Sequence, residues 1–167
     1  MNVDENGYLK WEKTYGDNGE DVFNMITRSK DNNFIAVGYS ESFFSKGMKD
    51  VLVVKIDSLG NKMWMNLYGS KNDDIGNSVF ECKDGGFAVA GETASFGSGK
   101  KDVLILKTNS NGVQKWKSSV GGKGVDFGKS IEELSKGGFI VSGTSTISNL
   151  SFDSILIKTD KKGKTSN

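Results

Sequence analysis

The feature that most constrains the fold of this chain is a unit that occurs three times in tandem. Its clearest marker is a turn glycine followed four residues later by a tryptophan, as at Gly7 and Trp11. The glycine recurs at steps of 53, 52 and 51 residues, at Gly60, Gly112 and Gly163. Further columns with this spacing are Asp21, Asp74 and Asp126; Phe34, Phe87 and Phe139; Gly38, Gly91 and Gly143; Asp50, Asp102 and Asp153; Lys55, Lys107 and Lys158. Such a period indicates a repeat architecture, because one unit cannot bury its apolar face alone.

Each unit contains four short segments with the composition of β-strands. In the second unit they are 77–82, 87–92, 103–108 and 114–120. Glycine-containing turns and one longer loop join them, which is typical of successive hairpins. Runs such as Val103-Leu104-Ile105-Leu106 are apolar without alternation, which indicates strands buried on both faces. No helix is expected, because the apolar runs are short, β-branched and bounded by glycine.

Strands buried on both faces favour a β-propeller over a sandwich or a small barrel. In a propeller each four-stranded blade packs between two neighbours, whereas the other folds bury one face of each sheet. Periods of about 40–50 residues are typical of propeller blades. We therefore expect an all-β fold in which one propeller domain or part-domain spans residues 1–167. Its sequence repeats are 7–59, 60–111 and 112–162.

The repeats are circularly shifted relative to the expected blades. If the tryptophan strand is outermost, the chain opens with an outer strand, 9–15, that has no blade of its own, and 155–159 lacks an outer partner. Residues 3–7 match 56–60, so Met1 falls inside a former strand. Two interpretations stay open: two chains form a six-bladed ring, each N-terminal strand completing the other's last blade, or the chain is a piece of a longer propeller. A compact monomer is disfavoured because it leaves strand edges open.

The columns also resemble a known type of repeat. The second unit carries Asp84-Gly85-Gly86-Phe87, then Ser95-Phe96-Gly97, then the turn with Gly112 and Trp116. This pattern resembles repeats of bacterial and archaeal cell-surface β-propellers (the SBBP-like group), and its turn is similar to quinoprotein-type propeller repeats. The likeness covers essentially the whole chain. It departs at Asn32-Asn33, where the pattern has Gly-Gly, and at Thr146-Ile147, where it has Ser-Phe.

The resemblance implies a scaffold and no single activity or cofactor. It also implies a cell-surface or extracellular location if the chain belongs to a longer precursor. Residues 1–5 lack the apolar core of a signal peptide, so the sequence itself leaves the location open.

Composition excludes several classes of function. The chain has 22 Lys and Arg against 21 Asp and Glu, a formal net charge of +1, so no strong field attracts nucleic acid or an anionic membrane. It has no His, which excludes a Ser–His or Cys–His nucleophile pair and a His-ligated metal or haem. The single cysteine, Cys82, cannot form an intrachain disulfide. Apolar runs are far shorter than a membrane span.

Candidate ligand-binding residues lie on the rim that carries the longer loops, because variable loops on a rigid scaffold often bind ligands. The long loops are 40–49, 93–101 and 144–152, and the links between units are 16–20, 69–73 and 121–125. The candidate residues are Phe43, Phe96, Asp21, Asp74, Asp126 and Lys100.

Each candidate has two interpretations. Phe43 and Phe96 could stack on a sugar ring or plug the space between blades, and Ile147 in the same column favours the plug. The aspartate column could line a cation or sugar site, but we expect each member to cap its own turn by accepting backbone N–H bonds. Lys100 and its neighbouring lysines are expected to be solvated. A calcium loop is a weaker alternative; its oxygen ligands would be Asp17, Glu20, Asp21, Asn72, Asp73 and Asp74.

The sequence favours a non-catalytic binding or scaffold module whose ligand is a protein or a carbohydrate. The alternative is a polysaccharide-acting enzyme, or a fragment of one, with two propeller-face carboxylates of separated pKa. Catalytic acids should break the repeat symmetry, and those that do are Glu41, Glu92, Glu132 and Glu133. No neighbouring feature suggests a raised pKa for them. We therefore assign no catalytic residue, no metal site and no cofactor.

Overall fold

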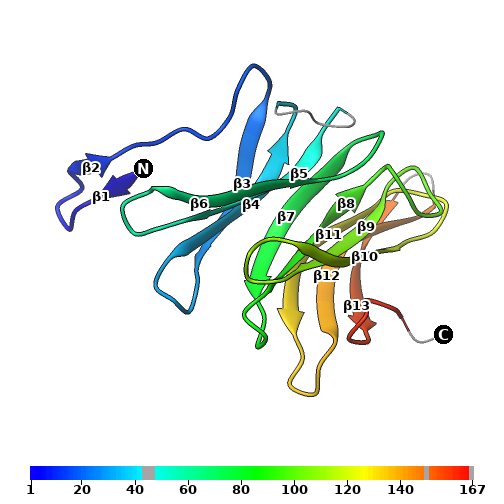
Figure 1. Ribbon diagram of the computed structural model, residues 1–167. Helices are drawn as coiled ribbons and strands as arrows, with labels where there is room; N and C mark the ends of the chain where they lie inside the picture. The colour runs from blue at the N-terminus through cyan, green and yellow to red at the C-terminus, as the bar shows by residue number, and fades with distance from the viewer. Residues whose placement is uncertain (43–47, 149–150, 166–167) are drawn as a thin grey trace.

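The computed structural model is an all-β protein (Figure 1) and describes residues 1–42, 48–148 and 151–165. Within these ranges the chain forms four antiparallel sheets and no helix. A helix capable of crossing a membrane is therefore absent from the described residues. The described strands confirm that the chain is all-β.

Three of the sheets correspond to the three repeats, and in each the strands follow chain order. The first sheet contains β3 (Asp21–Arg28), β4 (Phe34–Ser40), β5 (Asp50–Ile56) and β6 (Lys62–Tyr68). The second contains β7 (Asp74–Glu81), β8 (Phe87–Thr93), β9 (Asp102–Thr108) and β10 (Gln114–Val120). The third has only β11 (Asp126–Glu133), β12 (Phe139–Ser148) and β13 (Ser151–Thr159). A fourth, two-stranded sheet pairs β1 (Asn2–Val3) with β2 (Leu9–Trp11).

The tight turns have the chemistry that the sequence indicates. Gly60 and Gly112 have φ values of +77° and +76°, a conformation that glycine adopts without steric cost. Asn32 holds a φ of +64° at the first position of the Asn32-Asn33 departure. Asparagine tolerates this left-handed region better than other side chains do. The departure from Gly-Gly therefore preserves the turn between β3 and β4.

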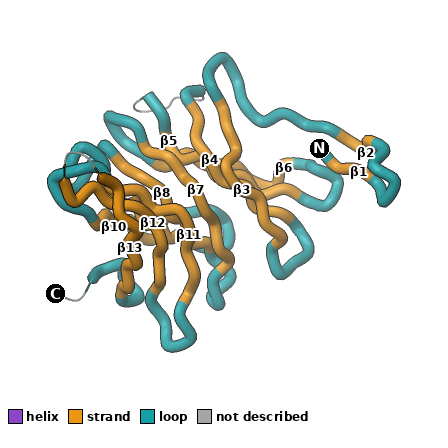
Figure 2. Tube along the Cα trace, turned by 180° about the vertical axis from the view of Figure 1, so that it is seen from behind, coloured by secondary structure: helices purple, strands orange, loops and turns teal. Residues whose placement is uncertain are grey.

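The sheets pack face to face, and the second sheet lies between the other two (Figures 1 and 2). One core cluster joins residues of the first and second sheets, including Val37 and Val89. Another joins the second and third sheets, including Ile105 and Val141. All seven residues of β9 are buried. The non-alternating apolar runs of β5 and β9 thus mark strands covered on both faces, as predicted. The prediction is wrong for the run Ile155-Leu156-Ile157 of β13, where Leu156 is exposed.

Equivalent contacts hold successive sheets together. The ring of Trp64 on β6 lies 5.8 Å from that of Phe87 in the second sheet. Trp116 on β10 lies 5.7 Å from Phe139 in the third sheet. Each tryptophan also lies against a turn glycine of the next repeat, Gly112 and Gly163 respectively. The inference that the tryptophans pack between repeats is confirmed.

The predicted third-repeat loop 144–152 is wrong. β12 continues to Ser148 and β13 begins at Ser151, with Thr146 opposite Phe152. The corresponding segment of the second repeat contains Gly97, whose φ is +125°, and it leaves the sheet. The third repeat has β-branched residues and no glycine at this point, and these favour extended pairing.

The N-terminal strand also differs from its prediction. It is shorter than 9–15, and it is not unpaired, because β1 lies beside β2. Trp11 and Tyr15 pack against the outer face of the first sheet. Burial of these two rings holds the hairpin in place.

Candidate functional site

The recurring aspartates at the start of each first strand are structural caps. The Asp74 carboxylate accepts hydrogen bonds from the Ser70 N–H at 3.0 Å and the Ser95 hydroxyl at 2.7 Å. Asp21 has the same two kinds of donor, and Asp126 accepts from the Gly122 N–H at 2.8 Å. These bonds bear out the expected capping role.

Because of these caps, little of the aspartate side chains is accessible to a ligand. Asp74 and Asp126 are each 1% exposed. Asp102, at the start of β9, is 2% exposed and accepts from the backbone N–H groups of Ser98 and Gly99. A Cβ on Gly121 would lie 2.2 Å from an Asp102 oxygen and 2.5 Å from an Asp126 oxygen. The link between these repeats therefore needs glycine, and a ligand would reach the carboxylates only after the loops rearranged.

The predicted aromatic and basic candidates take different positions. Phe43 lies outside the described residues. Phe96 is half-buried, packs against the core cluster of the first two sheets, and has the Lys117 ammonium 4.5 Å from its ring centre. This arrangement favours the plug. Lys100 has an exposed side chain, and its backbone N–H donates to the Gly124 carbonyl at 2.9 Å.

Two of the symmetry-breaking acids, Glu92 and Glu133, engage neighbouring basic or backbone groups. Glu92 is 7% exposed and accepts a hydrogen bond from the Lys101 ammonium at 2.6 Å. Glu133 accepts from the Lys83 backbone N–H at 2.7 Å. Wherever a carboxyl pKa shifts among the described residues, it falls; these groups are Glu20, Asp31, Asp57, Asp84 and Asp160. A general acid for glycoside cleavage needs the opposite shift.

Glu20, one of the calcium-loop candidates, makes contacts with protein groups. Glu20 accepts from the Tyr39 hydroxyl at 2.8 Å and from the Lys49 ammonium at 3.2 Å. Those hydrogen bonds, with Tyr39 contributing most, lower the pKa of Glu20. Across the part of the chain that the structure describes, no three His, Cys, Asp or Glu side chains gather to hold a metal ion.

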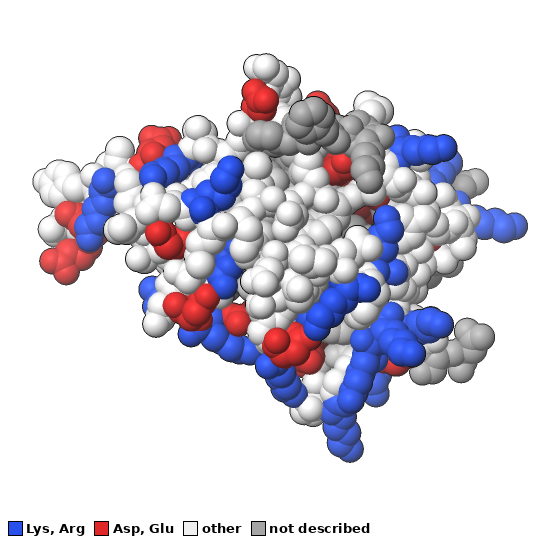
Figure 3. Space-filling view, in the orientation of Figure 1, with Lys and Arg blue, Asp and Glu red and all other residues white. Residues whose placement is uncertain are grey.

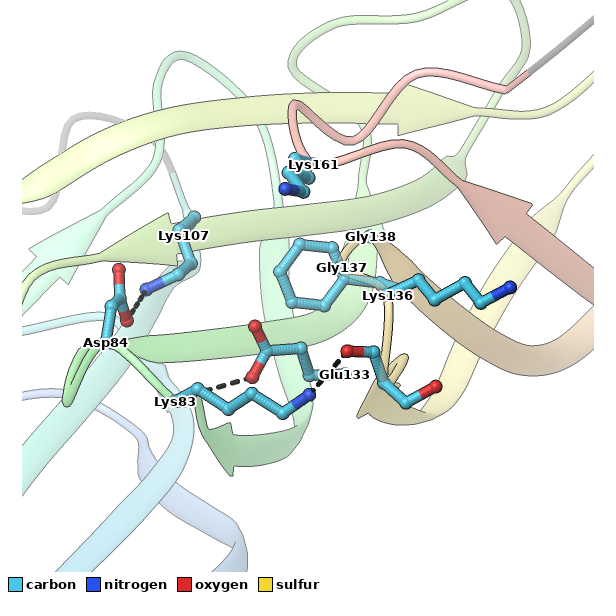
Figure 4. A pocket seen from close by; sticks show the side chains of 10 residues that line it. Lys83, Asp84, Lys107, Glu133, Lys136, Gly137, Gly138 and Lys161 are labelled. Atoms are coloured by element: carbon cyan, nitrogen blue, oxygen red, sulfur yellow. Dashed lines mark hydrogen bonds and ion pairs between the residues drawn. The ribbon is translucent and has the colours of Figure 1, made fainter.

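Sequence reasoning missed a shallow pocket on the opposite rim, among the tight turns of the second and third repeats (Figure 4). Its volume is about 380 Å³. The charged side chains that line it are Lys83, Asp84, Lys107, Glu133, Lys136 and Lys161. In the space-filling view, basic side chains gather at the lower right, over the turns of the third sheet (Figure 3).

Two of these lysines are already neutralised or bonded. Lys107 is 6% exposed and donates to Asp84 at 2.9 Å, while the Lys83 ammonium donates to the Ser135 carbonyl at 2.9 Å. Lys136 occupies the column of Asp31 and Asp84. The pocket's surplus positive charge therefore arises where the third repeat replaces an acid with a lysine, a signal that the sequence contains.

The free thiol of Cys82 is not a nucleophile in this fold. The residue is 0% exposed, and burial raises its pKa to about 11. A thiol reacts as the thiolate, so Cys82 stays inert at neutral pH. This agrees with the packing role expected from sequence.

The fold and its rims define an all-β repeat protein whose charged side chains chiefly stabilise turns and sheet junctions. No protein-family model matches the chain, and no curated protein matches it. The likeness to cell-surface propeller repeats therefore rests on the sequence columns themselves.

Proposed function

We propose that this chain is a set of β-propeller blades that acts as a non-catalytic binding and scaffold module. The observation that carries the proposal is the repetition of one junction. Trp64 meets Phe87 and Trp116 meets Phe139 at nearly the same distance, 5.8 and 5.7 Å. A constant junction relates each sheet to the next by nearly the same rotation, and repeated rotation about one axis generates a propeller.

The proposed binding face is the rim of longer loops, and the proposed ligand is a carbohydrate or a protein. The loop 93–101 is tied to the link of the next repeat by the bond from Lys100 to Gly124 and by a parallel bridge between Lys101 and Val125. Such ties give the loop a defined shape, which reduces the entropy that binding must overcome. The resemblance to surface propellers supports a ligand outside the cell.

Calorimetric titration of the purified chain with soluble polysaccharides tests the binding function. For a polysaccharide that binds the unmodified chain, we expect Lys100→Ala to weaken binding, because Lys100 is exposed on this rim. Lys62→Ala is the matched control, since Lys62 is exposed on β6 away from these loops. If the chain releases reducing ends from a polysaccharide and Glu92→Gln abolishes that release, the chain is a hydrolase and the proposal is overturned.

A crystal structure tests the propeller arrangement. We expect the three repeat sheets to radiate from a common axis with β3, β7 and β11 innermost. Sheets that instead translate along an axis would make the chain a solenoid and overturn the proposal.

A further inference from the structure

The third sheet has an uncovered face, and its outer edge is open along most of β13, beyond a bridge between Thr159 and Thr165. β13 is its last strand, and Leu156 on that strand is 76% exposed. The residues in the same column of the first two sheets, Val53 and Ile105, are 1% and 0% exposed. Lys158 is also exposed, whereas Lys107 in its column is buried. An edge of this kind can accept a further strand.

The N-terminal hairpin carries a surplus outer strand with matching register. Each outer strand places its tryptophan opposite the same column of the preceding strand. The equivalent pairs are Asn2 with Trp11, Lys55 with Trp64, and Lys107 with Trp116. β2 therefore corresponds to the outer strand of a blade, and the two-residue β1 takes the place of the strand beside it.

The hairpin lies where the outer strand of a preceding blade would lie. Trp11 lies against Gly60, as Trp64 lies against Gly112. The Tyr15 hydroxyl donates to the Gly60 carbonyl, as that of Tyr68 donates to Gly112. The first sheet thus already has the outer part of a neighbour docked on it, and the rest of that neighbour is a three-stranded sheet.

The third sheet of the same molecule cannot take that position. Figure 1 shows the N-terminal hairpin at one end of the row of sheets and β13 at the other. A second copy supplies the missing three strands, and the exchange is reciprocal because each copy carries both an open sheet and a surplus strand. Reciprocal exchange closes the contact, so the assembly is a dimer.

We propose, on the basis of the propeller function above, that β13 of one copy displaces β1 and pairs with β2 of a second copy. Each of the two shared sheets then has four strands, and the pair of chains has six four-stranded sheets in all. Transfer of the first sheet's register predicts the facing residues. They are Lys158 with Trp11, Leu156 with Lys13, and Ser154 with Tyr15.

Site-directed cross-linking between copies tests this register. Chains with Lys13→Cys are mixed with chains with Leu156→Cys, allowed to exchange, and oxidised. Directly facing strand positions have Cβ atoms about 4.5–5.5 Å apart, against about 7–8 Å for diagonal ones. We therefore expect a disulfide-linked dimer from this mixture and far less from the control, Lys13→Cys mixed with Ser154→Cys. Equal cross-linking in both would overturn the register.

Light scattering over a range of concentrations tests the exchange without cysteines. We expect a dimer of the 18.1 kDa chain. Asp4→Pro removes the backbone N–H that donates to the Tyr8 carbonyl at 2.9 Å. The competing β1–β2 hairpin therefore weakens, and dimerisation should tighten about fivefold, as for loss of roughly one hydrogen bond. Asp4→Ala keeps this donor and is the control.

The two proposals can fail separately. A monomeric mass at all concentrations without cross-linking would overturn strand exchange, and cross-linked species longer than a dimer would overturn the closed pair. Either result leaves polysaccharide titration of the rim as an independent measurement. Conversely, a cross-linked dimer that binds no polysaccharide would overturn the carbohydrate function and leave the exchange in place.

Discussion

β9 and β13 occupy the same position in successive repeats and yet lie in opposite environments. All seven residues of β9 are buried, whereas six of the nine residues of β13 are exposed. Their sequences differ little in apolar character, with Val103-Leu104-Ile105-Leu106 in β9 and Ile155-Leu156-Ile157 in β13. The difference lies in the neighbours, because a sheet packs against each side of the second sheet and only one side of the third is covered.

The comparison shows that the apolar sequence of a strand indicates the buried position that its repeat is suited to, even where the strand itself is exposed. Under the proposed strand exchange, the second copy would cover the exposed Leu156. The same contrast applies to charge: Lys107 is buried against Asp84, while Lys158 is exposed and its repeat has Lys136 in place of the acid.

The largest expected effect comes from truncating the central strand. Ile105→Ala removes buried methyl groups and leaves a cavity, so we expect a loss of about 3 kcal/mol in the free energy of unfolding. Leu156→Ala should cost less than about 0.5 kcal/mol for the monomer, as for exposed positions in general. Urea unfolding at low protein concentration measures both. Equal losses would show that the two strands share one environment.

The next effect comes from the ion pair of the second repeat. Asp84→Asn leaves the buried Lys107 without its carboxylate, so we expect a loss of about 1 kcal/mol, because the half-exposed carboxylate is screened by solvent. Urea unfolding near neutral pH gives the value. Lys158→Gln in the third repeat is the control and should be nearly neutral. A neutral Asp84→Asn would mean that Lys107 is satisfied by the Thr108 carbonyl alone.

Acid should lower the stability of the first two repeats, and the loss in the free energy of unfolding should be smaller than in the two predictions above. A hydrogen bond from Lys55 holds the pKa of Asp31 well below its usual range. Burial opposes ionisation of Asp84, yet hydrogen bonds from Lys107 and Lys115 lower its pKa as well. Because both pKa values are depressed on folding, their stabilisation is present above the unfolded pKa of about 4 and is lost as the pH falls further.

Thermal unfolding from pH 6 down to pH 2, over the range about and below the unfolded carboxylate pKa, measures this loss. Both carboxylates are partly exposed, so each should contribute less than about 1 kcal/mol. The double variant Asp31→Asn and Asp84→Asn should start lower and show a flatter acid dependence. An unchanged slope would assign the acid sensitivity to other carboxylates.

The smallest effect should come from restoring the acid to the third repeat. Lys136→Asp recreates the column of Asp31 and Asp84 opposite Lys158. An exposed pair stabilises by about 0–1 kcal/mol, and the substitution also removes a like charge near Lys161. A gain as large as the loss from Asp84→Asn would indicate that Lys158 is buried in solution, as strand exchange requires.

Sequence alone determined the local structure of this protein. Apolar runs and turn glycines set the strands β8, β9 and β10 nearly residue for residue, because buried strands and left-handed turns each require particular residue types. The repeat spacing set the three sheets. The capping role of Asp74 also followed from sequence, since it depends on the residue's own turn.

Only the tertiary structure decided what happens where the repeats differ or end. It extended β12 and β13 through the expected loop, placed β1 beside β2, and brought Lys83, Lys107 and Lys136 to one pocket. The two hairpins are pairings of neighbouring segments, and there the local preference for extended structure was greater than the repeat pattern indicated. The pocket depends on contacts between segments far apart in the chain, which no local pattern encodes. The contrast between β9 and β13 has the same origin, because burial of a strand is decided by the sheet that packs on it.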